Sequence, residues 1–290
     1  MQQLTDLAHA YTDIAEDLSP RATRIRWAGL SGRERGDERA DGPAFVFLHG
    51  LTFDRRMWDP VLGALPEGHR AIAFDLPAHG GSPALGRPGL AAVVDALHDA
   101  VVDAGLAAPI VVGHSIGGPL ASIYAATYPA SGVVSVDAPI RIEPFAELLR
   151  SMRPQLTEDG FDAVWARFRE SWRMELVPVE RRGLLRAGEQ ASLELVLGYQ
   201  HDLLERPLED VLRWREEGLG RLRRQRTPYV SLHANPVDPL DEASLRDLVP
   251  QAEVVVWPVG HHFPHLADPV GFVALLIELA RTGAAGNSRA

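Results

Sequence analysis

Residues 109–118 read PIVVGHSIGG, and this stretch decides the fold. Its first residues form a short apolar run and its last ones open a segment that favours a helix, which predicts a strand turning sharply into a helix. Ser115 lies at the turn between Gly113 and Gly117, in the spacing G-x-S-x-G. Such a turn strains the backbone of its serine and exposes the hydroxyl. We therefore predict that Ser115 is a nucleophile at the edge of a buried sheet.

The same alternation of strand and helix continues on both sides of this stretch. Short apolar runs alternate with longer segments of helical character, and strands that are apolar throughout indicate a parallel sheet buried on both faces. The predicted fold class is α/β, with a mostly parallel central sheet flanked by helices. The strand-like runs are AFVFLH, RAIAFDL, PIVVGH, GVVSVD, PYVSLH and EVVVWP, and the predicted helices lie near 56–65, 89–105, 116–128, 241–249 and 267–282. Residues 23–30 alternate like one further strand, and the polar run at 31–42 is interpreted as a turn or hairpin loop.

A helical block interrupts this pattern between residues 140 and 225, where no strand-like run occurs. A helical insertion in an α/β sheet is most simply a cap over the carboxyl ends of the strands, where such sheets bind ligands. We predict a core of residues 1–139 and 226–290 and a helical cap of residues 140–225. Within residues 1–20, a helix at 3–18 is expected to pack on the body or to serve as a lid or dimer arm.

The charge and residue usage exclude several chemistries. The net charge of -10 disfavours nucleic acid and anionic membranes as partners and favours a small neutral or cationic substrate. All 29 basic residues are arginine and no cysteine occurs, which excludes Schiff-base lysines, thiol nucleophiles and thiolate metal sites. The amino-terminal segment lacks the pattern of a signal peptide, so we expect a cytoplasmic protein. The sequence leaves open whether it is a monomer or a homodimer.

The stretch GHHFPHLADP at residues 260–269 holds three histidines, which could be metal ligands or include a catalytic base. Zinc needs three or four ligands that converge, and histidines four apart converge only on a regular helix. Pro264 interrupts the segment between His261 and His265, and the glutamate of an HExxH motif is missing. We therefore predict one catalytic histidine here, with no metal and no cofactor.

Five motifs in this order resemble those of the α/β-hydrolase family. They are FLHGLTFDRRMW at 47–58, FDLPAHGGS at 74–82, GHSIGG at 113–118, HANPVDP at 233–239 and the stretch at 260–269. The resemblance covers about residues 40–140 and 225–280 and is greatest to capped serine hydrolases, which include esterases, lactonases, carbon–carbon bond hydrolases and cofactor-free haloperoxidases. It implies a catalytic serine, acid and histidine in that chain order.

For the acid, the resemblance favours Asp238, which follows the strand PYVSLH in the pattern NPVDP. Asn235 stands near the glycine usual in the family, so Asp241 is a second candidate in a shifted register. Asp137 follows the strand GVVSV, and a minority of relatives use that position, but its expected role is to cap the entry to the helical insertion. Asp75 also ends a strand, but the resemblance implies that it holds the loop PAHGGS in place.

For the base, the resemblance favours His262, since Pro264 and Leu266 then match the family's ending. His261 is the alternative. His265 is expected to be a buried or capping histidine at the start of the last helix.

For the oxyanion hole, the resemblance implies the backbone N–H groups of Leu51 and Ile116. His49 and His114 are expected to bond loop backbone. His49 is also a candidate pocket residue, as are Trp165 and Trp172, whose helical spacing does not show whether they face the core or the pocket.

The leading hypothesis is a serine hydrolase that cleaves a carboxylic ester or lactone of a small to medium organic substrate through an acyl-enzyme. One alternative keeps the triad but uses it for carbon–carbon bond hydrolysis or another pathway-specific reaction. The other alternative is a hydrolase-like sensor that binds a small molecule and signals to a partner protein.

Overall fold

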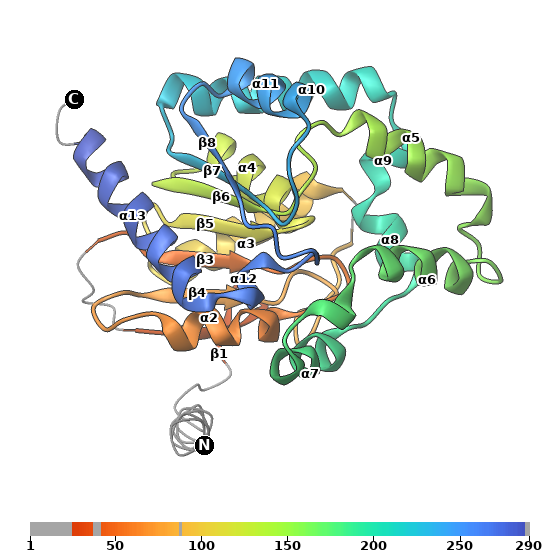
Figure 1. The fold of residues 1–290 in the computed structure, drawn as a ribbon, viewed down its shortest axis with the longest axis horizontal. Coiled ribbons are helices and arrows are strands. Elements are labelled where there is room, and N and C mark those ends of the chain that lie inside the picture. The colour runs from red at the N-terminus through yellow and green to blue at the C-terminus, as the bar shows by residue number, and fades with distance from the viewer. Residues whose placement is uncertain (1–24, 37–41, 87–88, 288–290) are drawn as a thin grey trace.

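The molecule is built around one sheet with helices on both of its faces (Figure 1). The computed structural model describes residues 25–36, 42–86 and 89–287. The helix predicted at residues 3–18 lies outside the described residues. The predicted α/β class with a mostly parallel sheet is confirmed.

The eight strands follow the order β1-β2-β4-β3-β5-β6-β7-β8. Strands β1 and β2 form an antiparallel hairpin whose second strand pairs antiparallel with β4, and all pairs from β4 to β8 are parallel. The bounds are β1 Ile25–Trp27, β2 Leu30–Arg35, β3 Phe45–Leu48, β4 Ala71–Phe74, β5 Ile110–His114, β6 Gly132–Val136, β7 Tyr229–His233 and β8 Ala252–Val256.

The hairpin corrects one expectation, because the start of the polar run at residues 31–42 is a strand and not a loop. Strand β2 is hydrogen-bonded on both sides, to β1 and to β4, so its polar residues stay in the sheet. Only its first half is buried, and its Arg33, Glu34 and Arg35 are more exposed. Backbone pairing has overridden the polar composition that suggested a turn.

Each face of the sheet has its own buried core. On β3, for example, Val46 and Leu48 pack in one cluster with helices α3 and α4, whereas Phe45 and Phe47 pack in the other with α2 and α13. This alternation with burial on both sides is what the apolar strands predicted. The core helices are α2 Asp59–Ala64, α3 Leu90–Asp103, α4 Gly117–Thr127, α11 Pro239–Leu248, α12 Pro264–Ala267 and α13 Pro269–Asn287, with a short 3-10 helix η1 at Arg55–Trp58. Within the described ranges, no helix combines the length and apolarity needed to cross a membrane.

The region at residues 140–225 is helical, as predicted, and Figure 1 shows α5 to α9 gathered beyond one end of the strands. A third core cluster, which includes Leu149, Phe161 and Trp165, joins α5, α6, α8 and α9, whereas Leu185 of α7 packs in the core cluster of Phe45 and Phe47. The last helix of this region, α10, packs along α4, and its Leu219 and Leu222 join the core of the sheet. The helices are α5 Glu143–Met152, α6 Phe161–Ser171, α7 Val179–Gly188, α8 Leu193–Tyr199, α9 His201–Glu205 and α10 Leu208–Gln225, with 3-10 turns η2 Arg153–Gln155 and η3 Met174–Leu176.

Replacing Gly113 with alanine should destabilise the fold by about 3 kcal/mol or more, because the tight turn leaves no room for a side chain. A Cβ atom at Gly113 would lie 1.8 Å from the carbonyl oxygen of Gly117. The control is Gly183→Ala in α7, where nothing lies within 4 Å of the added atom. That change should leave stability equal or raise it by up to about 1 kcal/mol. Urea unfolding measures both, and a Gly113→Ala protein as stable as the wild type would contradict this packing.

Candidate active site

Ser115 lies on a strained turn between β5 and α4. Its φ is 53°, in the left-handed region that side chains other than glycine seldom occupy. The turn is fixed by hydrogen bonds from the Ser115 N–H to the Val136 carbonyl (2.8 Å) and from the Gly118 N–H to the Ser115 carbonyl (2.9 Å). Ser115 is half-buried and lines the large cavity beneath the helical block. The backbone therefore has the conformation that the G-x-S-x-G spacing predicts.

A carboxylate and an imidazole meet on the wall of the same cavity. The Nδ1 atom of His262 lies 2.6 Å from Oδ2 of Asp137. Asp137 directly follows β6, the neighbour of β5 in the sheet, and has a φ of 49°. Its other oxygen, Oδ1, accepts a hydrogen bond from the Ala234 N–H at 2.8 Å, and its own N–H donates to the Leu232 carbonyl. The carboxylate is thus held between the ends of β6 and β7 and aimed at His262.

The structure corrects the predicted acid, because Asp238 does not contact His262. Asp238 is exposed and caps α11, where its Oδ1 accepts a hydrogen bond from the Leu240 N–H at 2.8 Å. Asp241, the candidate in a shifted register, forms an ion pair with Arg141 instead. The prediction that Asp238 orients the imidazole is therefore wrong. The carboxylate that meets His262 is Asp137, which the sequence offered only as an alternative.

His262 is held by its backbone as well as by its ring. Its N–H donates to the Trp172 carbonyl at 3.0 Å, and its carbonyl oxygen lies 2.7 Å from Nε2 of His114. The ring stacks on Trp172 with an interplanar angle of 17°. With a proton on Nδ1 facing Asp137, the Nε2 atom has its lone pair free to accept a proton.

The two neighbouring histidines are engaged elsewhere. His261 is buried, and its Nδ1 accepts a hydrogen bond from the Phe263 N–H at 3.2 Å. His265 is fully buried at the start of α12 and packs on Trp58, with ring centroids 4.4 Å apart. The expectation that His265 is a buried histidine is confirmed. Among the described residues, no group of three or more histidine, aspartate or glutamate side chains is arranged to hold a metal ion.

His49 supports the loop that follows β3. It is fully buried, its Nε2 accepts a hydrogen bond from the Leu76 N–H (2.9 Å), and its Nδ1 donates to the Gly50 carbonyl (2.8 Å). The expected bonding to loop backbone is confirmed for His49 and likewise for His114. The prediction that His49 lines the pocket is wrong, because its ring is turned into the loop and does not reach the cavity wall.

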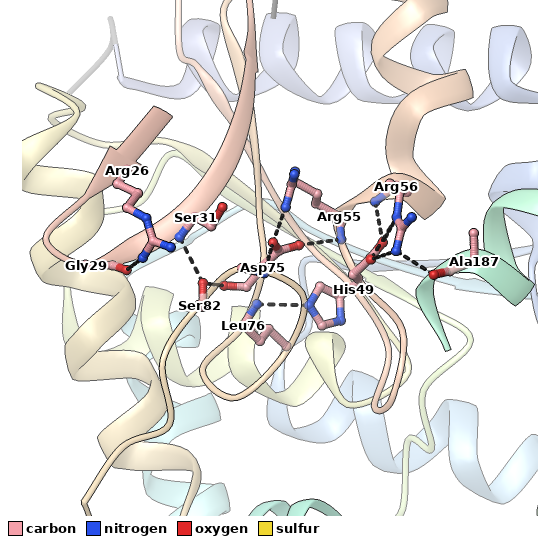
Figure 2. Close-up of polar contacts among 12 residues, drawn as sticks. Arg26, Gly29, Ser31, His49, Arg55, Arg56, Asp75, Leu76, Ser82 and Ala187 are labelled. Atoms are coloured by element: carbon pink, nitrogen blue, oxygen red, sulfur yellow. Dashed lines mark hydrogen bonds and ion pairs between the residues drawn. The ribbon is translucent and has the colours of Figure 1, made fainter. Parts of the chain in front are cut away.

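A buried ion pair also fixes the loop after β3 (Figure 2). The guanidinium of Arg55 pairs with Asp75, which is fully buried at the end of β4. The carboxylate of Asp75 also accepts hydrogen bonds from the backbone N–H groups of Arg55 (3.0 Å) and Gly81 (2.8 Å). Asp75 therefore holds the loop PAHGGS, as expected, and in addition ties it to the loop after β3.

The loop after β3 is also bonded to the helical block. Arg56 pairs with Asp54 and donates from Nη2 to the Ala187 carbonyl at 2.5 Å, a contact visible in Figure 2. The N–H of Gln190 donates to the Thr52 carbonyl at 2.7 Å. The segment between α7 and α8 is thus attached to the loop that carries Leu51.

The cavity itself has a volume of about 1050 Å³. Leu51, Ile116 and Ser115 lie on its wall at the ends of β3 and β5, with Trp165 and Trp172 of the helical block also lining it. Both tryptophans pack in the apolar cluster of the helical block and also reach the cavity. The two alternatives, core and pocket, therefore do not exclude each other. Polar residues from β6, β7 and α10 line a further part of the wall.

The stability of the fold should fall as the pH is lowered from about 6.5 towards 4. Burial lowers the pKa of His49 to about 4 and that of His79 to about 3, and it holds the pKa of His114 and of His265 well below 6.5. In the unfolded chain these rings regain a pKa of about 6.5, so below that pH the unfolded state binds protons that the folded state does not. Burial also lowers the pKa of His233 and of His261. It raises the pKa of Asp59 to about 6, so this one group opposes the six histidines. Urea unfolding at half-unit steps of pH measures the change, and a free energy of unfolding that stays constant or rises from pH 7 to 5 would contradict it.

Comparison with known proteins agrees with this architecture. The model of a family described as "Alpha/beta hydrolase family" matches residues 45–275. A protein of Escherichia coli (strain K12 / DH10B) named "Putative carbamate hydrolase RutD" is 28% identical over 249 residues, which are 82% of this chain and 91% of that protein.

Two solved structures show the same fold. The enol-lactonase from Burkholderia xenovorans LB400 has a TM-score of 0.69 at 17% identity and covers 88% of this chain and 98% of its own. A thermophilic esterase from Thermogutta terrifontis has a TM-score of 0.68 at 20% identity and covers 90% and 99%, respectively. At these identities the likeness establishes the fold alone.

Proposed function

Because the chain belongs to the alpha/beta hydrolase family, we propose that it is a serine hydrolase that cleaves a carboxylic ester or lactone through an acyl-enzyme. The observation that carries this proposal is the 2.6 Å contact between His262 Nδ1 and Asp137 on the wall of the cavity that Ser115 also lines. A serine hydroxyl needs a base to become a nucleophile, and an imidazole oriented by a carboxylate is the base that serves it at neutral pH.

In the proposed reaction, the Ser115 oxygen attacks the carbonyl carbon of the substrate while Nε2 of His262 accepts the hydroxyl proton. Asp137 fixes the imidazole tautomer and stabilises the imidazolium. The backbone N–H groups of Leu51 and Ile116 donate to the oxyanion. The imidazolium then gives its proton to the departing alkoxide, which leaves Ser115 acylated. Water, deprotonated by His262, attacks the acyl-enzyme, and the imidazolium returns the proton to the Ser115 oxygen as the acid is released.

The cavity supports a substrate of small to medium size. Its volume of about 1050 Å³ lies near the upper end of the range for small-molecule sites, and aromatic rings form part of its wall. The relative of 28% identity is named as a putative carbamate hydrolase, and a carbamate, like an ester, has a carbonyl carbon bonded to a heteroatom. That name supports acyl transfer for this chain as well.

A fluorescent phosphonate that reacts with activated serines tests the nucleophile. We expect it to label the wild-type protein and to leave Ser115→Ala unlabelled. The labelling rate of Asp137→Asn should be much lower than that of the wild type, because its imidazole no longer holds the tautomer that activates Ser115. Equal labelling of the wild type and Ser115→Ala would overturn the proposal.

A substrate panel then separates the chemical classes. Aryl esters, lactones and aryl carbamates of similar size should include at least one that turns over with a strict requirement for Ser115. Phosphonate labelling of Ser115 together with rates near background for the whole panel would favour carbon–carbon bond hydrolysis. If Ser115 is not labelled and no substrate turns over, but ligands raise the melting temperature, the results would favour the sensor hypothesis.

A further inference from the structure

The charged side chains on the cavity wall differ in whether the protein supplies them with a partner. The acids are engaged, since Asp137 meets His262, Asp202 pairs with Arg206, and Asp95 accepts a hydrogen bond from Tyr128. Arg215, on α10, also lines the cavity. Among the residues that the structure describes, no carboxylate lies within ion-pair distance of it.

The guanidinium of Arg215 is only partly satisfied by the protein. Its Nη2 donates to the Ile140 carbonyl, and its Nε and Nη1 atoms have no hydrogen-bond partner in the described part of the chain. Neither of these two nitrogen atoms is fully buried, so a ligand in the cavity can reach them. The nearest acidic groups, Glu143 and Glu216, act on it only from beyond ion-pair distance. Burial lowers the pKa of Arg215 because its cation loses hydration, and the opposing influence of Tyr229, Glu143 and Glu216 offsets this only in part.

Two hydroxyl groups complete a polar end of the cavity beside Arg215. The hydroxyl of Tyr229 interacts electrostatically with Arg215 and lies 3.1 Å from the Oγ atom of Ser122. Ser122 donates its own proton to the Gly118 carbonyl at 3.0 Å, so the Tyr229 hydroxyl is the donor to Ser122. Both residues line the cavity. This corner thus offers a cation with two unused donor atoms in a setting that excludes much of the bulk water.

We propose that Arg215 binds a carboxylate at the end of the substrate remote from the scissile carbonyl, so that the preferred substrates are anionic esters or lactones. A guanidinium presents donors in a planar fork that matches a carboxylate. Ser115 lies two residues before the start of α4 and Ser122 is the sixth residue of that helix, so a rise of 1.5 Å per residue places the polar end roughly 10 Å from the nucleophile. The inference rests on the proposed hydrolase function and adds the charge and length of the acyl group.

The test uses monoaryl esters of straight-chain dicarboxylic acids of increasing length. Each is matched by the ester in which a neutral primary amide replaces the free carboxylate, and the readout is the ratio of kcat/KM for the acid to kcat/KM for the amide. In the wild type this ratio should exceed one and reach its maximum when the chain spans roughly 10 Å. In Arg215→Gln the ratio should fall between about 10-fold and 100-fold, as expected for the loss of a hydrogen bond between charged groups.

The matched control is Arg213→Gln on the same helix. Arg213 is exposed and pairs with Asp210, so its loss changes the net charge equally without touching the cavity. Its ratio should equal that of the wild type. A ratio that is unchanged in Arg215→Gln, or that falls equally in both variants, would overturn the inference while Ser115-dependent turnover of the neutral esters would leave the hydrolase proposal intact.

A binding measurement decides the matter even if no ester is hydrolysed. Dicarboxylates of the same lengths should raise the melting temperature of the wild type and of Arg213→Gln, and raise that of Arg215→Gln much less. Equal shifts in all three proteins, or none in the wild type, would refute the carboxylate site. Failure of the hydrolase proposal would instead appear as absent turnover and absent phosphonate labelling.

Discussion

Replacing Ser115 with alanine should lower kcat for an ester substrate by about 10⁴-fold or more, because the change removes the atom that attacks the carbonyl in the proposed reaction. What rate remains would come from substrate binding and the oxyanion donors alone. Initial rates under saturating substrate measure the effect. The fold should be retained, since the turn is held by backbone hydrogen bonds of Ser115 and Gly118 that do not involve the hydroxyl.

The control for this prediction is Ser151→Ala. Ser151 is an exposed residue of α5 whose hydroxyl donates to the Leu148 carbonyl. Its removal should leave kcat and kcat/KM within about twofold of the wild type, as is usual for surface substitutions. A Ser115→Ala protein that keeps a tenth or more of the wild-type kcat would show that another group is the nucleophile.

Replacing Asp137 with asparagine should lower kcat by about 10⁴-fold, with a much smaller effect on stability. The amide has nearly the shape of the carboxylate and can still accept the hydrogen bond from the Ala234 N–H. However, its NH₂ group cannot accept the hydrogen bond that Nδ1–H of His262 donates to the carboxylate, so the ring is held in the wrong tautomer or turns away. Its inability to stabilise an imidazolium adds to the loss. The kcat of the variant at several pH values measures the effect.

Asp238→Asn is the paired experiment, because it makes the same chemical change at the other candidate acid. Asparagine is as good a helix cap as aspartate, so α11 should keep its start, and neither kcat nor stability should change by more than a small factor. Asp238→Ala should cost about 1 kcal/mol of stability through loss of the cap, again without loss of activity. A large loss of kcat in Asp238→Asn would mean that the loop after β7 moves towards His262 during catalysis.

Most of the fold could be predicted because buried parallel strands are apolar on both faces and leave a clear trace in the sequence. Runs such as AFVFLH and GVVSVD became β3 and β6, and the region without such runs became helices. The exception is β2, which is polar because it lies in the antiparallel part of the sheet near its edge. Its place is set by hydrogen bonds to both neighbours, and composition does not record them.

The candidate site was predictable where its residues are fixed by a local pattern. The G-x-S-x-G spacing predicted the strained turn at Ser115, and the family resemblance around Pro264 favoured His262, whose ring contacts a carboxylate. The acid that pairs with His262 could not be predicted in this way, because it depends on which strand end the imidazole reaches. The positive φ of Asp137 and the return of the Asp238 side chain to its own helix decide this, and neither can be read from the sequence. The position of Asp137 directly after a buried strand was the one available signal.

The net charge and the cavity lead to different expectations about the substrate. A charge of -10 favours neutral or cationic molecules at the surface, where each charge contributes to one field. Inside the cavity, the guanidinium of Arg215 has no ion-pair partner among the described residues, and electrostatic interactions strengthen as water is excluded. Under the proposal for Arg215, this local charge outweighs the distant field and favours an anionic ligand.

The most direct test of the account is the proton NMR signal of the imidazole Nδ1–H of His262. A proton in a short hydrogen bond to a carboxylate resonates far downfield of ordinary amides, and this measurement needs no substrate. We predict such a resonance in the wild type and in Asp238→Asn, and its loss in Asp137→Asn and in His262→Ala. A resonance that survives in Asp137→Asn and disappears in Asp238→Asn would contradict the pairing of His262 with Asp137.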